Sequence, residues 1–315
     1  MNSLLFFFLL LIAFIFSLVS ILLLKKLSFK YHLYDNPAGD TLKIHQKLIP
    51  YLGGMGIFIG FGAGLTLACL LHQISGLQAM GLILGSIIIL FLGFWDDLKW
   101  KNVGRPVIKL FCQFIAGFII VFILIKIGVN FNFSIYPILA ALIAGFYIVG
   151  AMNAMNMQDG MDGLAGGLTV ISVIGFFILS SLENNIFSSV LSLSLLGGII
   201  GFLIYNWHPT SIFMGDNGSH FLGFSLAVLA IIFTGHPIYN LKQFIGPILI
   251  IGLPVIDTAW TIIRRLIKGK SPFQGDRGHL YDRLYQKGLS IKKTVLICYG
   301  IQIIIVIGGV LIYYL

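Results

Sequence analysis

The chain has 315 residues, of which 58% are hydrophobic and only 10% charged, and its mean hydropathy is +1.00. Soluble domains contain about 45–50% apolar and about 25% charged residues, so this composition excludes a soluble protein and indicates an integral membrane protein. The net charge of +9 does not require nucleic acid as a partner, because the distribution of Lys and Arg between the two sides of a membrane accounts for it.

Ten apolar segments predict ten transmembrane helices, because each approaches the roughly twenty residues that a helix needs to cross a bilayer. They lack the short alternation of β-barrel strands, so the expected fold is an all-α, polytopic membrane protein with both termini on one side. We expect residues 1–315 to form a single transmembrane domain, whose first segment is an anchor rather than a cleaved signal peptide. The predicted spans are 3–24, 52–72, 77–95, 107–128, 135–152, 164–182, 187–205, 218–235, 243–263 and 294–314.

The loops on one side of the predicted membrane domain are rich in basic residues. Every Lys and Arg except Lys126 and Lys242 lies in these loops or at the flanking helix ends. The positive-inside rule therefore makes this side cytoplasmic and both termini extracytoplasmic, in a multi-pass protein of the plasma (inner) membrane. Every acidic residue except Glu183 lies on or near the same side, which predicts a site facing the cytoplasm. The cytoplasmic loops are about 25–51, 96–106, 153–163, 206–217 and 264–293.

The stretch "LGFWDDLKW" places Asp96 and Asp97 where the third predicted span ends. Acids at a helix C-terminus oppose the helix macrodipole, and two adjacent carboxylates repel each other unless a cation or a proton relieves them. Solvated acids at a helix end are the alternative interpretation. The unfavourable position indicates a functional role.

The stretch "NAMNMQDGMDGLAGG" follows the fifth predicted span. Asp159 and Asp162 are three residues apart, so in a helical turn they would share a face, and Asn153 and Asn156 repeat that spacing one turn earlier. The glycines between them allow close approach of the backbone to a ligand. A polar turn with glycines for helix packing is the alternative, but a turn requires neither these side chains nor their spacing.

Two further polar stretches lie on the same predicted side. In "FMGDNGSHFLGF", Asp216 stands at the start of the eighth span, where it serves either as a ligand or as a helix N-cap. In the last loop, "SPFQGDRGHLYDRLYQKG" follows Arg264 and Arg265 and contains His279. Guanidinium groups match phosphate oxygens bidentately, so this loop predicts diphosphate binding, with a solvated basic loop as the alternative.

The four stretches together supply carboxylates and amides for a hard cation, and basic side chains for phosphates. Mg²⁺ takes oxygen ligands, typically from one or two carboxylates, with waters and substrate phosphates completing its shell. Phosphoryl transfer asks a protein mainly for positioning and charge neutralisation. The sequence has no P-loop and no GxGxxG motif, so it gives no support to an ATPase.

Six sequence blocks, in this order, resemble the polyprenyl-phosphate N-acetylhexosamine-1-phosphate transferase family. The resemblance covers nearly the whole chain and is closer to the enzymes that transfer GlcNAc 1-phosphate to undecaprenyl phosphate than to phospho-MurNAc-pentapeptide transferase. It implies a Mg²⁺-dependent reaction, with Mn²⁺ as an alternative, in which a UDP-sugar and polyprenyl phosphate give polyprenyl-diphospho-sugar and UMP in the first membrane step of surface glycan synthesis. The blocks are "KIHQKLIPYLGG", "GFWDDLKW", "NAMNMQDGMDG", "FMGDNGS", "GLPVIDTAWTIIRR" and "SPFQGDRGHL".

The resemblance also implies roles for single residues. The uridine would be held by Met157, Asp159 and Asp162, with Phe213 stacking on the ring, and either Lys47 or His45 would reach the nucleotide. The set as a whole comprises Asp96, Asp97, Asp216 and His279 as catalytic residues, Asp216 and Asn156 as metal ligands, and Lys47, Lys109, Asn156, Met157, Asp159, Asp162, Phe213, Arg264 and Arg265 as substrate-binding residues.

The chemistry of the acceptor bears on the two adjacent acids. A phosphate monoester has its second pKa near ~6, so the lipid phosphate is largely dianionic at pH 7 and leaves a general base little proton to remove. We therefore expect Asp96 and Asp97 to position the metal or the lipid phosphate, with removal of a proton by one of them at lower pH as the alternative.

The last loop departs from the pattern of many relatives. It reads "HLYD", with Tyr281 and Asp282 where relatives carry histidines, although His279 is retained. This departure and the "LIPYLGG" first loop favour UDP-GlcNAc as the donor over the peptidoglycan precursor, which remains an alternative, as does another UDP-N-acetylhexosamine. A secondary transporter of phosphorylated solutes is the alternative from a different class, although transporters usually carry ionisable groups near the membrane midplane within repeats. The resemblance further implies a homodimer.

Overall fold

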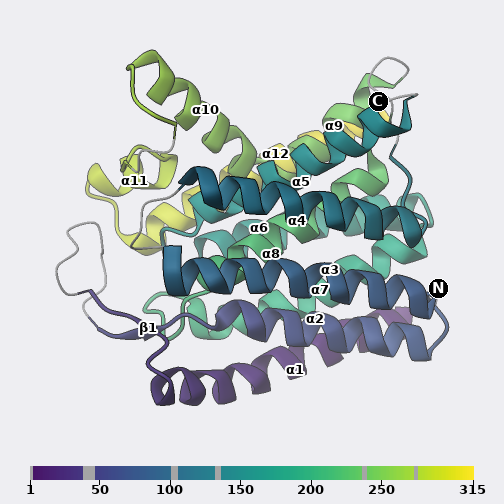
Figure 1. Ribbon diagram of the computed structural model, residues 1–315, viewed down its shortest axis with the longest axis horizontal. Helices are drawn as coiled ribbons and strands as arrows, with labels where there is room; N and C mark the ends of the chain where they lie inside the picture. The colour runs from purple at the N-terminus through teal and green to yellow at the C-terminus, as the bar shows by residue number, and fades with distance from the viewer. Residues whose placement is uncertain (1–2, 38–46, 101–105, 132–135, 236–239, 273–275) are drawn as a thin grey trace.

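The computed structural model describes residues 3–37, 47–100, 106–131, 136–235, 240–272 and 276–315, and this part of the chain is mostly helical (Figure 1). The helices run side by side, with short connections between them. They are α1 (Ser3–Lys30), α2 (Gly53–Leu70), α3 (Gly76–Trp95), η1 (Asp96–Trp100), α4 (Pro106–Lys126), α5 (Pro137–Gln158), α6 (Leu164–Leu182), α7 (Ile186–Asn206), α8 (Gly215–Phe233), α9 (Leu241–Ile251), α10 (Leu253–Ile267), α11 (Leu280–Gln286) and α12 (Ile291–Tyr314).

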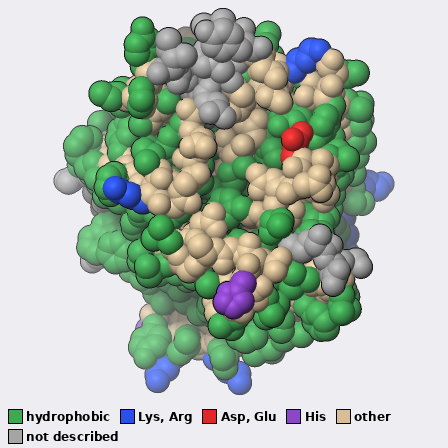
Figure 2. All heavy atoms as spheres, turned by 90° about the vertical axis from the view of Figure 1, so that its right-hand side faces the viewer, with side chains coloured by type: hydrophobic (Ala, Val, Ile, Leu, Met, Phe, Trp, Pro, Cys, Tyr) green, Lys and Arg blue, Asp and Glu red, His purple; other side chains and the backbone are tan. Residues whose placement is uncertain are grey.

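Within the described residues, nine helices are long and apolar enough to cross a membrane, and α9 with α10 makes a tenth span if this bent pair is counted as one. The predicted all-α, polytopic fold is thus confirmed. Figure 1 shows the two termini at the same end of the bundle, as an even number of crossings requires. Figure 2 looks onto that end, where charged side chains are scattered singly among hydrophobic side chains, other side chains and backbone.

The ninth predicted span, 243–263, is not a continuous helix. It breaks between α9 and α10, whose axes differ by 88°. Gly252 lies at the break with φ of +72°, a conformation that favours glycine, and the buried Gln302 of α12 satisfies the interrupted backbone. Its amide oxygen accepts from the N–H of Leu253 at 2.7 Å, and its amide nitrogen donates to the carbonyls of Ile250 and Ile251. Non-helical backbone at membrane depth needs such internal partners.

Helix α8 is the central element of the bundle. It packs against α2, α3 and α5, and it is buried over most of its length. Small side chains such as Gly218, Gly223 and Ala227 let neighbouring helices approach it closely, which is the usual basis of helix packing in membranes. Because α8 begins at Gly215, the acid Asp216 enters the bundle from its first turn.

The loops at the end opposite the termini are held together by main-chain hydrogen bonds. Strand β1 (Tyr34–Asp35) pairs antiparallel with β2 (Ile49–Pro50), with Tyr34 opposite Pro50. The N–H of Phe213 donates to the carbonyl of Pro50 at 2.7 Å, and the N–H of Gly53 donates to the carbonyl of Phe213 at 3.0 Å. The starts of α2 and α8 are therefore fixed side by side beneath this small sheet.

Candidate active site

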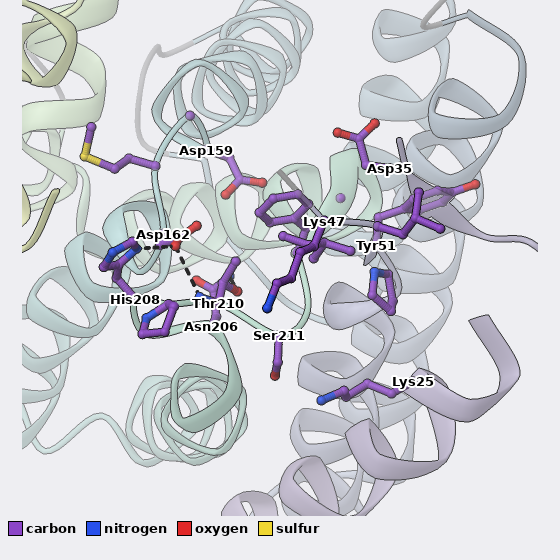
Figure 3. A pocket seen from close by; sticks show the side chains of 18 of the residues that line it. Lys25, Asp35, Lys47, Tyr51, Asp159, Asp162, Asn206, His208, Thr210 and Ser211 are labelled. Carbon is purple, nitrogen blue, oxygen red and sulfur yellow. Dashed lines mark hydrogen bonds and ion pairs between the residues drawn. The ribbon is translucent and has the colours of Figure 1, made fainter. Parts of the chain in front are cut away.

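A cavity of about 860 Å³ opens at this end of the bundle, between the α5–α6 turn, the α7–α8 loop and the small sheet (Figure 3). Its size is within the roughly 300–1,000 Å³ that is usual for small-molecule sites. In Figure 3, Lys25 and Lys47 extend toward the cavity from the side opposite Asp162 and His208. The polar residues that line it are Lys25, Asp35, Lys47, Tyr51, Asp97, Asp159, Asp162, Asn206, His208, Thr210, Ser211 and Asp216.

Asp96, Lys109 and Asp216 meet at the inner end of this region. The ammonium group of Lys109, from α4, forms an ion pair with the buried Asp96 of η1 and lies 3.4 Å from Oδ2 of Asp216, on α8. Three helical segments thus place two carboxylates around one ammonium, and Asp216 is 107 positions from Lys109 in the sequence. This arrangement relieves the charge that makes Asp96 unfavourable at a helix C-terminus.

Asp97 lies against the N-terminus of α8. Its Oδ1 accepts from the N–H of Asp216 at 3.1 Å, and its Oδ2 accepts from the N–H and the side-chain amide of Asn217 at 3.3 and 3.0 Å. A carboxylate stabilises a helix N-terminus because it satisfies free N–H groups and complements the macrodipole. Asp97, rather than Asp216, therefore caps α8, and Asp216 is free to face Lys109 and the cavity.

Asn156 joins α5 to the same centre. Its amide nitrogen donates to Oδ1 of Asp216 at 2.8 Å and to the hydroxyl of Ser219 at 3.0 Å. The expected metal-ligand pair, Asn156 and Asp216, is therefore adjacent, but the amide nitrogen is a donor and cannot ligate a cation. The amide oxygen would face Asp216 only after a 180° rotation of the amide.

Asp159 and Asp162 line the cavity from a turn rather than from a helix. Helix α5 ends at Gln158, so the expected helical face does not include them, because the glycines that follow interrupt the helix. Oδ2 of Asp162 lies 2.7 Å from Nδ1 of His208 and accepts from the N–H of Thr210 at 3.2 Å. These contacts join the α5–α6 turn to the α7–α8 loop.

Asn206 and His208 are site residues that the sequence motifs did not single out. Asn206 Oδ1 accepts from the N–H of Gly163, and its Nδ2 donates to the carbonyl of Ile212, so it bridges the two loops that form one wall. The signal available in the sequence was the polar run "NWHPTS" between two apolar spans.

The basic residues of the last loop form a second cluster that does not line the cavity. Arg264 and Arg265, at the end of α10, both donate to Asp276, at 2.9 and 2.8 Å. Nδ1 of the buried His279 lies 2.7 Å from Oδ2 of Asp257, and its ring stacks on Tyr281. In this structure the predicted diphosphate-binding groups are thus engaged with carboxylates of the chain itself.

The second cluster is joined to the cavity wall at the end of α5. The amide nitrogen of Gln158 donates to Oδ2 of Asp257 at 2.9 Å, and the hydroxyl of Tyr281 donates to the carbonyl of Met157 at 3.3 Å. Met157 therefore contributes a main-chain group to this junction. These contacts join α10 and α11 to the end of α5, directly before Asp159.

Charge and burial shift the pKa values of the acids in this loop in opposite directions. Burial alone would raise the pKa of Asp276, but the hydrogen bond and charge of Arg265, with those of Arg264, outweigh it and hold that pKa below its usual 3.8. Burial raises the pKa of Asp282, and it likewise raises the pKa of the Tyr281 phenol. Asp276 is therefore the anionic partner of the two arginines at neutral pH.

The structure brings most of the predicted site residues together. Lys109, Asn156 and Asp96 contact Asp216 directly or through one another, and the cavity wall includes Phe213. His45, the alternative to Lys47 near the nucleotide, lies outside the described residues. The predicted residues that line the cavity are Lys47, Asp97, Asp159, Asp162, Phe213 and Asp216, whereas Arg264, Arg265 and His279 belong to the second cluster.

The donor set around Asp216 suits a hard divalent cation in its chemistry. Asp96 and Asp216 present two carboxylates to one ammonium, that of Lys109, so one negative charge is in excess when both are ionised. Among the described residues, no three acidic, His or Cys side chains converge on one point. A Mg²⁺ ion here would therefore need oxygen ligands from substrate phosphates, as is usual for this ion.

The chain is similar along most of its length to sugar-phosphate transferases of bacteria. A family model described as glycosyl transferase family 4 matches residues 79–234. Over 312 residues the chain is 33% identical to the probable undecaprenyl-phosphate N-acetylglucosaminyl 1-phosphate transferase of Bacillus subtilis, covering 95% of this chain and 84% of the relative. It is 29% identical over 292 residues to the decaprenyl-phosphate N-acetylglucosaminephosphotransferase of Mycolicibacterium smegmatis, covering 81% and 70%. It is 28% identical over 311 residues to the undecaprenyl-phosphate alpha-N-acetylglucosaminyl 1-phosphate transferase of Yersinia pestis, covering 94% and 81%.

Proposed function

The chain belongs to glycosyl transferase family 4, and we propose that it transfers N-acetylglucosamine 1-phosphate from UDP-N-acetylglucosamine to polyprenyl phosphate, releasing UMP. In this reaction an oxygen of the lipid phosphate attacks the β-phosphorus of the donor, the bond from that phosphorus to the oxygen that bridges it to the α-phosphorus breaks, and UMP leaves with that oxygen. The named activities of the relatives favour this function over phospho-MurNAc-pentapeptide transfer and over secondary transport.

One structural observation carries the proposal: Asp96, Lys109, Asn156 and Asp216 converge from four helical segments beside a cavity open to one end of the bundle. Phosphoryl transfer depends on holding anionic groups in line and neutralising their charge. The ammonium of Lys109, held between two carboxylates, supports the holding of anionic groups in line. A substrate phosphate that binds it can take the place of one of these carboxylates.

The cavity residues have separate roles in the proposal. Asp159, Asp162 and Phe213 would bind the uridine, and Lys47 would reach the donor's phosphates. Lys109 would bind the lipid phosphate, which is largely dianionic near pH 7 because its second pKa is near ~6. We assign Asp97 the role of fixing the first turn of α8, and with it Asp216, because three donors of that turn already occupy its oxygens.

The residues of the second cluster would bind the donor after they exchange carboxylates of the chain for its phosphates. Arg264 and Arg265 would bind the donor's diphosphate by exchanging Asp276 for phosphate oxygens, since guanidinium groups bind both anions in the same bidentate geometry. His279, held by Asp257, would approach the same phosphates from α11. Asp257 contacts Gln158 and Tyr281 contacts Met157, and through these contacts a change of partners in the second cluster would reach the cavity.

We propose Mg²⁺ as the cofactor, with Mn²⁺ as a substitute. When bound by Asp216, with Asn156 after rotation of its amide, it would neutralise charge on the donor's diphosphate. Asp96 would then retain Lys109 as its partner. The excess of carboxylates over ammonium groups around Asp216 supports this assignment.

The proposed orientation places the cavity in the cytoplasm, where UDP-sugars are made, in the plasma (inner) membrane of the cell. The concentration of Lys and Arg in the loops at the cavity end supports this orientation. The implied homodimer and the cytoplasmic loop boundaries stay predictions.

An assay of the purified protein tests the proposed function. The protein in detergent would be incubated with undecaprenyl phosphate, Mg²⁺ and one UDP-sugar at a time: UDP-GlcNAc, UDP-GalNAc, UDP-glucose or UDP-MurNAc-pentapeptide. We expect UMP and a new lipid product with UDP-GlcNAc, and neither in EDTA or with Asp216→Asn. Release of UMP with UDP-MurNAc-pentapeptide alone would replace this proposal by the peptidoglycan alternative.

A further inference from the structure

A second set of polar side chains lies inside the bundle, beyond the proposed site. Gln113 of α4 and His220 of α8 are fully buried, and Asn153 of α5 lies beside them. The amide nitrogen of Asn153 donates to Oε1 of Gln113 at 2.8 Å, and Nε2 of Gln113 lies 3.3 Å from Nε2 of His220. We call these three residues the polar layer.

The polar layer mirrors the proposed site one helical turn deeper in the bundle. On each of the three helices, the layer residue is three or four positions from a site residue, so the two side chains share a helix face. The pairs are Gln113 with Lys109 on α4, Asn153 with Asn156 on α5, and His220 with Asp216 on α8.

The hydrogen-bond donors and acceptors of the layer determine the protonation and the tautomer of His220. Asn153 uses its amide nitrogen twice, toward Gln113 and toward the carbonyl of Val149 at 2.8 Å, so its amide orientation is set. Oε1 of Gln113 is therefore an acceptor and its Nε2 is a donor, which makes Nε2 of His220 the acceptor. His220 is thus neutral and carries its proton on Nδ1.

The layer has an energetic cost that a purely apolar interior would not have. Nδ1 of His220, which carries the proton, has no hydrogen-bond partner among the described residues and no exposure to solvent. A buried polar group without a partner destabilises the folded protein, and three apolar residues of similar shape would avoid that cost. Buried polar groups of this kind are well attested as devices that fix the register of packed helices.

We propose that Gln113, Asn153 and His220 are positioning residues that fix the relative heights of α4, α5 and α8, and thereby hold Lys109, Asn156 and Asp216 at one level in the proposed site. The expected loss of kcat rests on the proposed function, whereas the coupling of the three helices does not. Sliding any of the three helices by one residue would break at least one bond of the layer, because the rise per residue is about 1.5 Å.

Substitutions of His220 separate positioning from packing. Gln places a polar atom where Nε2 of His lies, so His220→Gln retains the acceptor for Gln113, whereas Asn reaches only the position of Nδ1. His220→Asn and the apolar His220→Leu therefore both lose the bond to Gln113. Leu226→Ala is the matched control, because Leu226 is a fully buried residue of the same helix and its truncation removes packing outside the layer.

Four quantities would be measured on each purified variant: the melting temperature, the affinity for UDP with Mg²⁺ in the absence of lipid, and the kcat and KM for UMP release from UDP-GlcNAc. We expect His220→Leu and His220→Asn to lose about 10–100-fold in kcat, as loss of outer partners of a catalytic site typically does. His220→Gln should keep most of the wild-type kcat, and Leu226→Ala should lower the melting temperature with kcat retained.

A double-mutant cycle of Asn153→Ala and Gln113→Leu provides a readout that does not depend on catalysis. We expect the two losses in melting temperature to be non-additive, because each variant breaks the same bond. Equal kcat for His220→Gln and His220→Leu, or additive losses in this cycle, would overturn the inference. If the wild type releases no UMP from any donor, the proposed function fails, while the cycle still decides whether the layer couples the helices.

Discussion

Asp97 and Asp216 are 119 positions apart in the sequence, yet the main-chain N–H of Asp216 donates a 3.1 Å hydrogen bond to Oδ1 of Asp97. Asp97 thus follows the C-terminus of α3 and caps the N-terminus of α8. Partners on other helices stabilise the two adjacent acids that oppose the dipole of α3. The N-terminus of α8 stabilises Asp97, and Lys109 stabilises Asp96.

Replacement of Asp97 should abolish activity through the geometry of α8. In Asp97→Asn, the amide nitrogen would face the donors of Asn217, so at least one bond of the cap is lost. We expect activity to be lost at every pH between about 6 and 9, since no proton transfer is involved. UMP release across this range is the measurement, and recovery above about pH 8 would show instead that Asp97 removes a proton.

Close contact between α3 and α8 predicts the effect of a single methyl group. A Cβ on Gly93 would lie 2.4 Å from Cα of Asn217 and 2.6 Å from the carbonyl oxygen of Asp216, so Gly93→Ala must push α8 away. A shift of roughly 1 Å at a reacting centre costs on the order of 100-fold in rate. We expect a loss of that size in kcat for UMP release.

Gly62→Ala on α2 is the matched control for Gly93→Ala. A Cβ on Gly62 meets no atom within 4 Å, so this variant should retain wild-type kcat and gain slightly in helix propensity. Equal rates for Gly93→Ala and Gly62→Ala would contradict the close packing of α3 on α8 as the determinant of the position of Asp216.

The break between α9 and α10 predicts a destabilising substitution outside the cavity. Gln302→Leu removes the partner of the N–H of Leu253 and of the carbonyl of Ile250, and leaves the carbonyl of Ile251 with the Ser172 hydroxyl alone. Each buried backbone group left without a partner costs roughly 1–3 kcal/mol, so the melting temperature in detergent should fall by several degrees. Gln302→Glu keeps an acceptor for Leu253 alone and should be intermediate; a melting temperature of Gln302→Leu equal to that of the wild type would contradict this prediction.

The pair of arginines on Asp276 predicts a pH dependence of stability with a defined sign. The pKa of Asp276 is lowered in the folded protein, so its contribution is fully present above the usual 3.8 and is lost as the pH falls through the lower folded pKa. The difference in melting temperature between the wild type and Asp276→Asn should therefore be constant from about pH 5 to 8 and shrink below about pH 4. A difference that grows on acidification would contradict the ion pair.

The transmembrane architecture followed from hydropathy alone, since length and apolar content determine whether a helix spans a bilayer. The break in the ninth span did not follow, because Gly252 and Pro254 lie in an apolar run, and because the partner that satisfies the backbone, Gln302, is far away in the sequence. Hydropathy reports the cost of burying side chains and says nothing about which backbone bonds are made.

The residue types of the site were predictable, but their partners were not. Asp216, Asn156 and Lys109 were expected near one another and are in contact. The cap that Asp97 forms on α8 joins two helices far apart in the chain, so no local pattern could indicate it. His220 gave no signal either, because a single histidine in an apolar helix reveals neither its tautomer nor its partners.

The fate of the donor's β-phosphate tests the central proposal most directly. UDP-GlcNAc labelled in its β-phosphate would be incubated with the purified protein, undecaprenyl phosphate and Mg²⁺, and the lipid and aqueous phases would be separated. Transfer of a sugar 1-phosphate predicts that the label moves into the lipid phase while unlabelled UMP appears in water, with neither change in EDTA or for Asp216→Asn. Label that remains in water as UDP, or no transfer by folded protein, would contradict the proposed reaction.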